Sequence, residues 1–164
     1  MVFYLVIQDL RNNMAQALFV SREDIVKYTA LSGNIDTDRF IQWVKVAQDI
    51  HIQGYLGTKL FDKINNGIVN ANLVDPYLSL LNNYIKPMVI HWSMVEFMPF
   101  SAYTFGAKGV YKHNSENSEN VDKLEVDFLI EKERSIAEHY TRRFIDHMSF
   151  NQAQFPEYNT NNNE

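Results

Sequence analysis

The chain has 164 residues, no cysteine and a formal net charge of −5. This length suggests a single domain that can bury a core without disulfides or metal ions. The acidic balance argues against a nucleic-acid-binding protein, because such proteins use basic side chains to neutralise phosphates. The absence of cysteine excludes a disulfide framework and a thiolate zinc site.

The N-terminal segment Met1–Ile7 is apolar but too short to span a membrane. It also lacks the basic start and the cleavage site of a signal peptide. Two interpretations remain: a strand-like arm that pairs with a neighbouring chain, or an extension ahead of a compact domain. We therefore divide the chain into an N-terminal arm at 1–14, a helical domain at 15–150 and a tail at 151–164. No other stretch is long enough to cross a membrane, so we expect a soluble protein.

Three helices are predicted in the first half of the domain. Ser21 and Asp24 have the spacing of a capping box, which predicts a short helix after them. Residues 37–53 carry apolar side chains at spacings of three and four, which predicts an amphipathic helix. A further short helix is predicted at 58–65, where asparagines and a glycine close it. The residues expected to face the core are Ile25, Tyr28, Phe40, Ile41, Val44, Ala47, Ile50 and His51.

The next segment predicts the centre of a helical bundle. Asp75-Pro76 is a helix start, because Asp caps the helix and Pro fits its first position. Pro87 is expected to kink or restart this helix. Residues 88–100 are apolar nearly all round, as in a helix that is covered on every side.

A change of composition separates this segment from the last helix. Residues 101–120 mix aromatics, glycines and lysines, which predicts an extended loop or a short hairpin, followed by a polar linker. The last and longest helix is predicted at 121–150, with Asn120 as its cap. At about 1.5 Å per residue it is roughly 45 Å long, so one end is expected to project or to meet a neighbour. Its expected buried stripe is Leu124, Phe128, Ile136, Tyr140, Phe144 and Met148, with Leu129 and Ile145 beside it.

The expected fold class is therefore all-α. It is a bundle of about five helices with a long C-terminal helix, the loop or hairpin near 101–120, and flexible terminal arms. The tail at 151–164 is rich in asparagine and is expected to be flexible when free. Its segment Phe155–Tyr158 is either a peptide that docks on a partner or an ordinary frayed terminus. Deleting the chain from Phe155 onward is expected to leave the fold intact.

The sequence shows no constellation typical of catalysis. None of the five histidines has metal-ligand spacing, and His91, with Glu96 nearby, is expected to be a satisfied core histidine. Phosphate-binding loops and nucleophile elbows are missing from the sequence. We therefore expect no enzyme, no cofactor and no metal site. An enzyme of unrecognised type would instead show a cleft with perturbed acids or histidines.

Several segments together form a recognisable pattern. They are residues 17–28, 46–60, 84–92, 106–110 and 114–117, followed by the long helix and the Phe-Pro-Glu-Tyr segment. The ensemble resembles the small head–tail connector (adaptor, or head completion) proteins of tailed phages. The likeness is strongest to those of phages that infect Bacteroidetes hosts, including the crAss-like group. It covers roughly residues 15–158.

The resemblance implies a virion protein, made in the bacterial cytoplasm, that assembles with itself as a dodecameric ring. Such a ring lies between the portal protein and the tail proteins, and DNA passes through it without sequence-specific binding. In connectors of this type a loop and a terminal segment reach neighbouring subunits or the portal. The candidate interface residues by position are Tyr103, Phe105, Lys108, Val110, Tyr111, Lys112, Phe155, Pro156 and Tyr158. The alternative is another helical virion or regulatory module that binds one partner and has no affinity for a portal.

Overall fold

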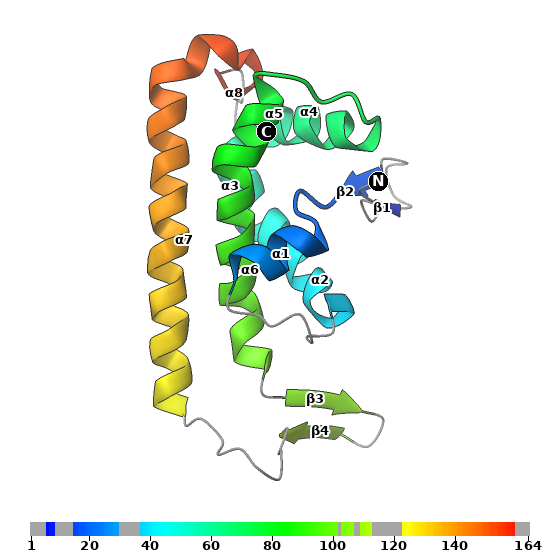
Figure 1. Cartoon of the computed structure of the whole chain (residues 1–164), viewed down its shortest axis with the longest axis vertical. Helices are drawn as coiled ribbons and strands as arrows, with labels where there is room; N and C mark the ends of the chain where they lie inside the picture. The colour runs from blue at the N-terminus through cyan, green and yellow to red at the C-terminus, as the bar shows by residue number, and fades with distance from the viewer. Residues whose placement is uncertain are drawn as a thin grey trace.

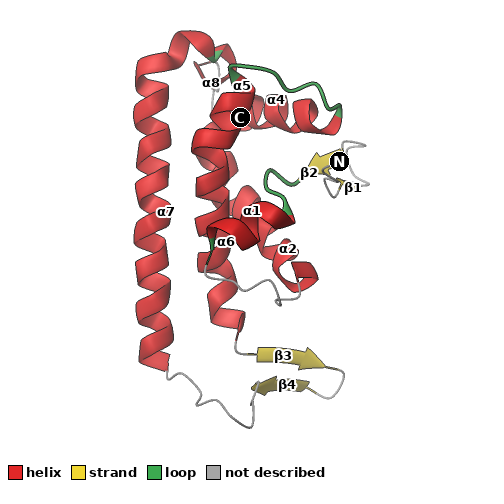
Figure 2. Ribbon diagram, viewed as in Figure 1, coloured by secondary structure: helices red, strands yellow, loops and turns green. Residues whose placement is uncertain are grey.

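The computed structural model describes residues 6–8, 15–29, 37–101, 103–106, 109–112 and 123–159. These residues are mostly helical, which confirms the all-α fold class (Figure 2). Helices α6 (Lys86–Ser101) and α7 (Lys123–Asn151) stand side by side and antiparallel (Figure 1). Two of the shorter helices, α1 (Arg22–Tyr28) and α2 (Thr37–Ala47), pack against α6. Helix α4 (Thr58–Val69) packs instead against α3 (Gln53–Leu56) and α8 (Pro156–Asn159), and two small antiparallel hairpins are attached to the bundle.

The N-terminal segment forms the first hairpin. Strand β1 (Val6–Gln8) pairs antiparallel with β2 (Ala15–Ala17), and Ile7 lies opposite Gln16. The strand-like interpretation is therefore confirmed for residues 6–8, but their partner is a strand of the same chain. The rest of the expected arm, residues 1–5 and 9–14, lies outside the described residues.

Helix α1 (Arg22–Tyr28) begins at the predicted capping box. The Asp24 N–H donates to Ser21 Oγ at 3.2 Å, and the Ser21 N–H donates to Asp24 Oδ2 at 3.0 Å. These two bonds satisfy backbone donors that have no partner inside the first turn. Ile25 is buried as expected. Tyr28 was expected to face the core, but it is exposed because α1 ends there and only its Ile25 face packs on the bundle.

The amphipathic helix of residues 37–53 is confirmed and is longer than predicted. Helix α2 (Thr37–Ala47) continues through the π-helical segment η1 (Gln48–Ile52) into α3 (Gln53–Leu56). The wider π turns rotate the residues that follow relative to a regular α-helix. As a result Ile52 is buried, whereas Ile50, which was expected to face the core, is exposed.

Helix α4 (Thr58–Val69) extends four residues beyond its predicted end at Asn65. It follows Gly57, whose φ of 73° lies in the region that favours glycine. Asn65 was expected to help close the helix, but the helix continues past it. Its side chain is buried and accepts a 2.7 Å hydrogen bond from the Ala17 N–H. An asparagine that looks like a helix stop in the sequence therefore fixes strand β2 against α4.

The central helix begins as α5 (Tyr77–Leu80) and passes through η2 (Leu81–Ile85) into α6 without a break. In η2 the Lys86 N–H bonds to the Leu81 carbonyl, five residues back. Pro87 has no N–H and follows at once, so the wide turn absorbs the missing bond and the helix continues. Helix α6 is covered by other elements on most of its surface, as its apolar sequence predicted. Its buried residues are Met88, Val89, Ile90, Trp92, Ser93, Met94, Val95 and Phe97.

The chain after α7 differs from the expectation of a flexible tail. Segment η3 (Gln152–Gln154) and helix α8 (Pro156–Asn159) fold back over the upper end of the bundle (Figure 1). Phe155 lies between them, is 1% exposed and contacts the Tyr77 ring edge-on at 5.6 Å. The expectation that residues from Phe155 onward hold little of the core is therefore wrong up to Asn159, because this aromatic anchor is buried within its own chain. Residues 160–164 lie outside the described residues.

Candidate protein-interaction site

The predicted loop or hairpin near residues 101–120 is a hairpin. Strand β3 (Tyr103–Gly106) pairs antiparallel with β4 (Gly109–Lys112) at the lower end of the bundle (Figure 1). Tyr103 lies opposite Lys112, and Phe105 lies opposite Val110. Five of the loop candidates, Tyr103, Phe105, Val110, Tyr111 and Lys112, are therefore strand residues, while Lys108 lies outside the described residues.

The three candidates in the tail are not brought together with the hairpin. Phe155, Pro156 and Tyr158 lie at the upper end, and β3 and β4 lie at the lower end (Figure 1). Phe155 is buried in the chain's own core, and Tyr158 is half-buried, with its ring edge-on to Phe144 at 6.0 Å. Of the three, Pro156 is exposed. In this fold Phe155 is therefore not available to dock on a partner.

The first turns of α7 form an exposed apolar surface, which we call the helix tip: Leu124, Phe128 and Leu129. Leu124 is 77% exposed and Phe128 is 70% exposed, although both were expected in the buried stripe. The stripe was built from steps of four residues, and each step turns about 40° beyond a full helical turn. Six steps from Leu124 to Met148 therefore rotate roughly 240°, so the two ends of the stripe face different directions.

The side of α7 that faces the core, which we call its seam, confirms this geometry. Ala137, Thr141, Phe144 and Met148 are its buried residues, and they face α6. At about 100° per residue, Leu124 and Phe128 point roughly 150° away from the mean direction of that group. Leu124 and Phe128 thus form a second apolar face on the side of α7 opposite the seam, and Leu129 lies about 90° from the seam. This exposed face lies at the N-terminal end of α7, and the expectation that one end of the long helix projects or meets a neighbour stays a prediction.

The histidines at the bundle centre are paired with carboxylates. His91 Nδ1 contacts Glu133 Oε1, and His51 Nε2 lies 2.8 Å from Glu96 Oε1. His91 is satisfied as expected, but by Glu133 of α7 and not by the nearby Glu96. Within the described residues no group of three or more histidine, cysteine or acidic side chains is arranged to hold a metal ion. Over the same ranges, no helix has the length and apolar character needed to cross a membrane.

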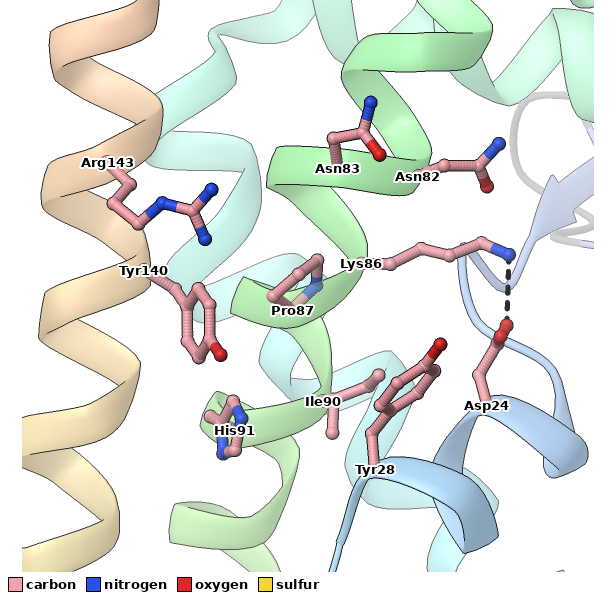
Figure 3. A pocket seen from close by; sticks show the side chains of 10 residues that line it. All are labelled: Asp24, Tyr28, Asn82, Asn83, Lys86, Pro87, Ile90, His91, Tyr140 and Arg143. Carbon is pink, nitrogen blue, oxygen red and sulfur yellow. Dashed lines mark ion pairs between the residues drawn. The ribbon is translucent and has the colours of Figure 1, made fainter.

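One pocket of about 490 Å³ opens beside the central helix, between α1, η2, α6 and α7. Lys86 Nζ lies 3.0 Å from Asp24 Oδ2 along one wall, and Tyr140 and Arg143 of α7 form the opposite wall (Figure 3). Burial acts to raise the pKa of the Asp24 carboxyl. Hydrogen bonds from the Ser21 N–H and from Lys86, together with the Lys86 charge, outweigh burial and hold this pKa below its ordinary value. The ion pair is therefore present at neutral pH.

Residues 52–164 match the family described as a family of unknown function (DUF6712). The chain belongs to this family. The DUF6712 match spans α4, the central helix, the β3–β4 hairpin, α7 and α8, and it begins after β1, β2, α1 and α2. The helix tip lies inside it, as do most residues of the pocket, but Asp24 and Tyr28 do not. No curated protein and no solved structure matches the chain.

Proposed function

We propose that this chain is a structural subunit of a tailed-phage virion, which assembles with itself as a ring between the portal and the tail. The ring extends the DNA channel and presents a docking surface to tail proteins. The proposal gives the chain a structural role without catalysis, cofactor or membrane contact. It rests on the sequence resemblance to head–tail connectors and on the exposed helix tip.

The helix tip is the observation that carries the assembly role. Leu124, Phe128 and Leu129 are large apolar side chains that lie together on one helix end and enclose a shallow hollow with Glu125. Contiguous exposed apolar surface with charged neighbours is typical of a protein–protein contact. Covering a large apolar side chain contributes about 1.5–3 kcal/mol. Covering these side chains therefore contributes part of the free energy of a contact between subunits.

A ring requires a contact between two different surfaces of neighbouring subunits, because identical surfaces that meet give closed dimers. The tip and the β3–β4 hairpin lie at the same lower end of the molecule (Figure 1). A neighbour that receives the tip therefore lies close to the hairpin residues proposed for the interface.

Quantitative mass spectrometry of purified virions, scaled to the portal protein, tests the proposal. A ratio near one copy per portal subunit supports a connector ring. Many copies per portal subunit would instead indicate a capsid or tail-tube protein. Absence from virions would overturn the proposal and favour a regulatory module that binds one partner.

A further inference from the structure

Arg143 is held in place by two tyrosine rings. Its guanidinium carbon lies 5.6 Å from the centre of the Tyr84 ring and 5.5 Å from that of Tyr140. Tyr84 is itself stacked on His147 with ring centres 4.1 Å apart, and Tyr140 is stacked on His91 at 5.1 Å. Both rings are therefore fixed, and a guanidinium beside two fixed rings loses little freedom when it binds a ligand.

The guanidinium projects from α7 toward the pocket wall formed by η2 and Pro87 (Figure 3). Among the described residues no carboxylate lies within ion-pair distance of Arg143, in contrast to Lys86, which is paired with Asp24. The rings satisfy the face of the cation but not its N–H donors, which lie in the guanidinium plane. Because Arg143 is exposed and lines the pocket, these donors are open to a ligand there.

The other lining residues define the charge and shape of the ligand. Asp24 is neutralised by Lys86, so Arg143 leaves the lining with one excess positive charge. Asn82 and Asn83 add exposed side-chain amides, and Pro87 and Ile90 add apolar wall. One excess cation is too few to hold a nucleic-acid backbone, which requires several. A carboxylate on a short aliphatic stem fits this combination, because guanidinium and carboxylate form two parallel hydrogen bonds.

We propose that this pocket is a binding site for a glutamate- or aspartate-containing peptide segment of a partner protein, with Arg143 as the group that binds the carboxylate. The amides of Asn82 and Asn83 bind the peptide backbone at the rim, and the apolar wall receives the aliphatic part of the acidic side chain. The inference is independent of the ring assembly, because the pocket and the helix tip are different surfaces with no residue in common.

The test is a titration of the full chain, labelled with ¹⁵N, with a hexapeptide of glutamate and with a hexapeptide of glutamine. Substitution of Arg143 identifies its Nε–H resonance. With the glutamate peptide this resonance should move and saturate, and with the glutamine peptide it should stay in place. Equal shifts with both peptides, or tighter binding of inorganic phosphate than of the glutamate peptide, would overturn the carboxylate assignment.

Arg142 provides a matched control, because it is an exposed arginine next to Arg143 that does not line the pocket. Arg143→Gln should weaken binding of the glutamate peptide at least about tenfold, whereas Arg142→Gln should leave it within about twofold. Arg143→Lys keeps the charge but loses the paired hydrogen bonds, so it should bind with intermediate affinity. Equal losses in the Arg142 and Arg143 variants would show charge attraction alone and would sink the proposal. Both variants change exposed side chains, so thermal unfolding should match that of the parent.

Discussion

The Phe19 N–H donates a 2.7 Å hydrogen bond to Oε1 of Gln48, a side chain that is fully buried in the π-helical segment η1. The same amide donates from Nε2 to the Ala17 carbonyl at 3.1 Å. One side chain therefore satisfies an acceptor at the end of β2 and a donor two residues further on. Buried polar groups in folded proteins are nearly always paired in this way. Gln48 thus joins the N-terminal segment to the bundle.

Gln48→Leu should destabilise the protein by about 2–6 kcal/mol, because it leaves a buried backbone N–H and a buried carbonyl without partners at about 1–3 kcal/mol each. Urea unfolding followed by circular dichroism measures the change in the free energy of unfolding. The control is Lys132→Leu, at an exposed residue of α7, which should change stability by no more than about 0.5 kcal/mol. Equal effects of the two substitutions would show that the Gln48 hydrogen bonds contribute little.

The helices themselves could be predicted from the sequence, because spacing and caps are local signals. The capping box of Ser21 and Asp24 and the apolar α6 are two examples. The partners of Gln48 and Asn65 could not, since they lie 29 to 48 residues away in the chain and only the tertiary fold brings them together. A polar residue on a helix is usually exposed, so the pattern alone gives no reason to bury it.

The helix tip and the tail were missed for different reasons. A check of rotation along α7 would have shown that Leu124 and Met148 cannot share a face, so this signal was present in the sequence. The burial of Phe155 had no such signal, because an asparagine-rich segment with one proline favours no helix. Its order comes from tertiary contacts, including the 2.6 Å hydrogen bond that the Tyr77 hydroxyl donates to Glu157. Burial and this carboxylate raise the pKa of Tyr77 to about 12.

Thr141→Val should cost about 1–3 kcal/mol of stability, because the buried indole N–H of Trp92 donates to Thr141 Oγ1 at 3.0 Å. Valine has nearly the same shape but no hydroxyl, so the loss measures the hydrogen bonds of Thr141 Oγ1, which also donates to the Ala137 carbonyl at 2.9 Å. Thr141→Ser keeps the hydroxyl and should retain most of that bond. Thermal and urea unfolding of the pair give the difference. A serine variant that is no more stable than the valine variant would argue against the bond.

Phe155→Ala should destabilise the protein by about 3–5 kcal/mol, as expected when a fully buried phenylalanine is truncated. Phe150→Ala is the matched control, because Phe150 lies five residues earlier and is 89% exposed. It should change the free energy of unfolding by no more than about 0.5 kcal/mol. Hydrogen exchange of the α8 amides adds a local measurement. If both variants unfold at the same urea concentration, the tail does not pack as described.

Protonation of His147 should lower the stability of the protein as the pH is lowered from 8 to 5.5. Burial lowers the pKa of His147 below its ordinary value of 6.5, so the folded protein binds this proton less readily than the unfolded chain. The free energy of unfolding therefore decreases as the pH drops through about 6.5, by at most about 1.4 kcal/mol per pH unit for one group. Urea unfolding at several pH values should give a shallower dependence in His147→Gln than in the parent. Identical slopes would exclude His147 as a source.

Replacing Leu124 and Phe128 together by serine should leave stability within about 0.5 kcal/mol of the parent, because both side chains are mostly exposed. Association between copies should weaken at least about tenfold, since burying each large apolar side chain contributes about 1.5–3 kcal/mol. Sedimentation velocity over a range of protein concentrations measures the association directly. Phe150→Ser is the control at the other end of α7, and it should associate like the parent although the side chain that it removes is even more exposed. Unchanged association in the Leu124 and Phe128 double variant would show that the helix tip is not the contact between copies. In that case the β3–β4 hairpin would be the next surface to test.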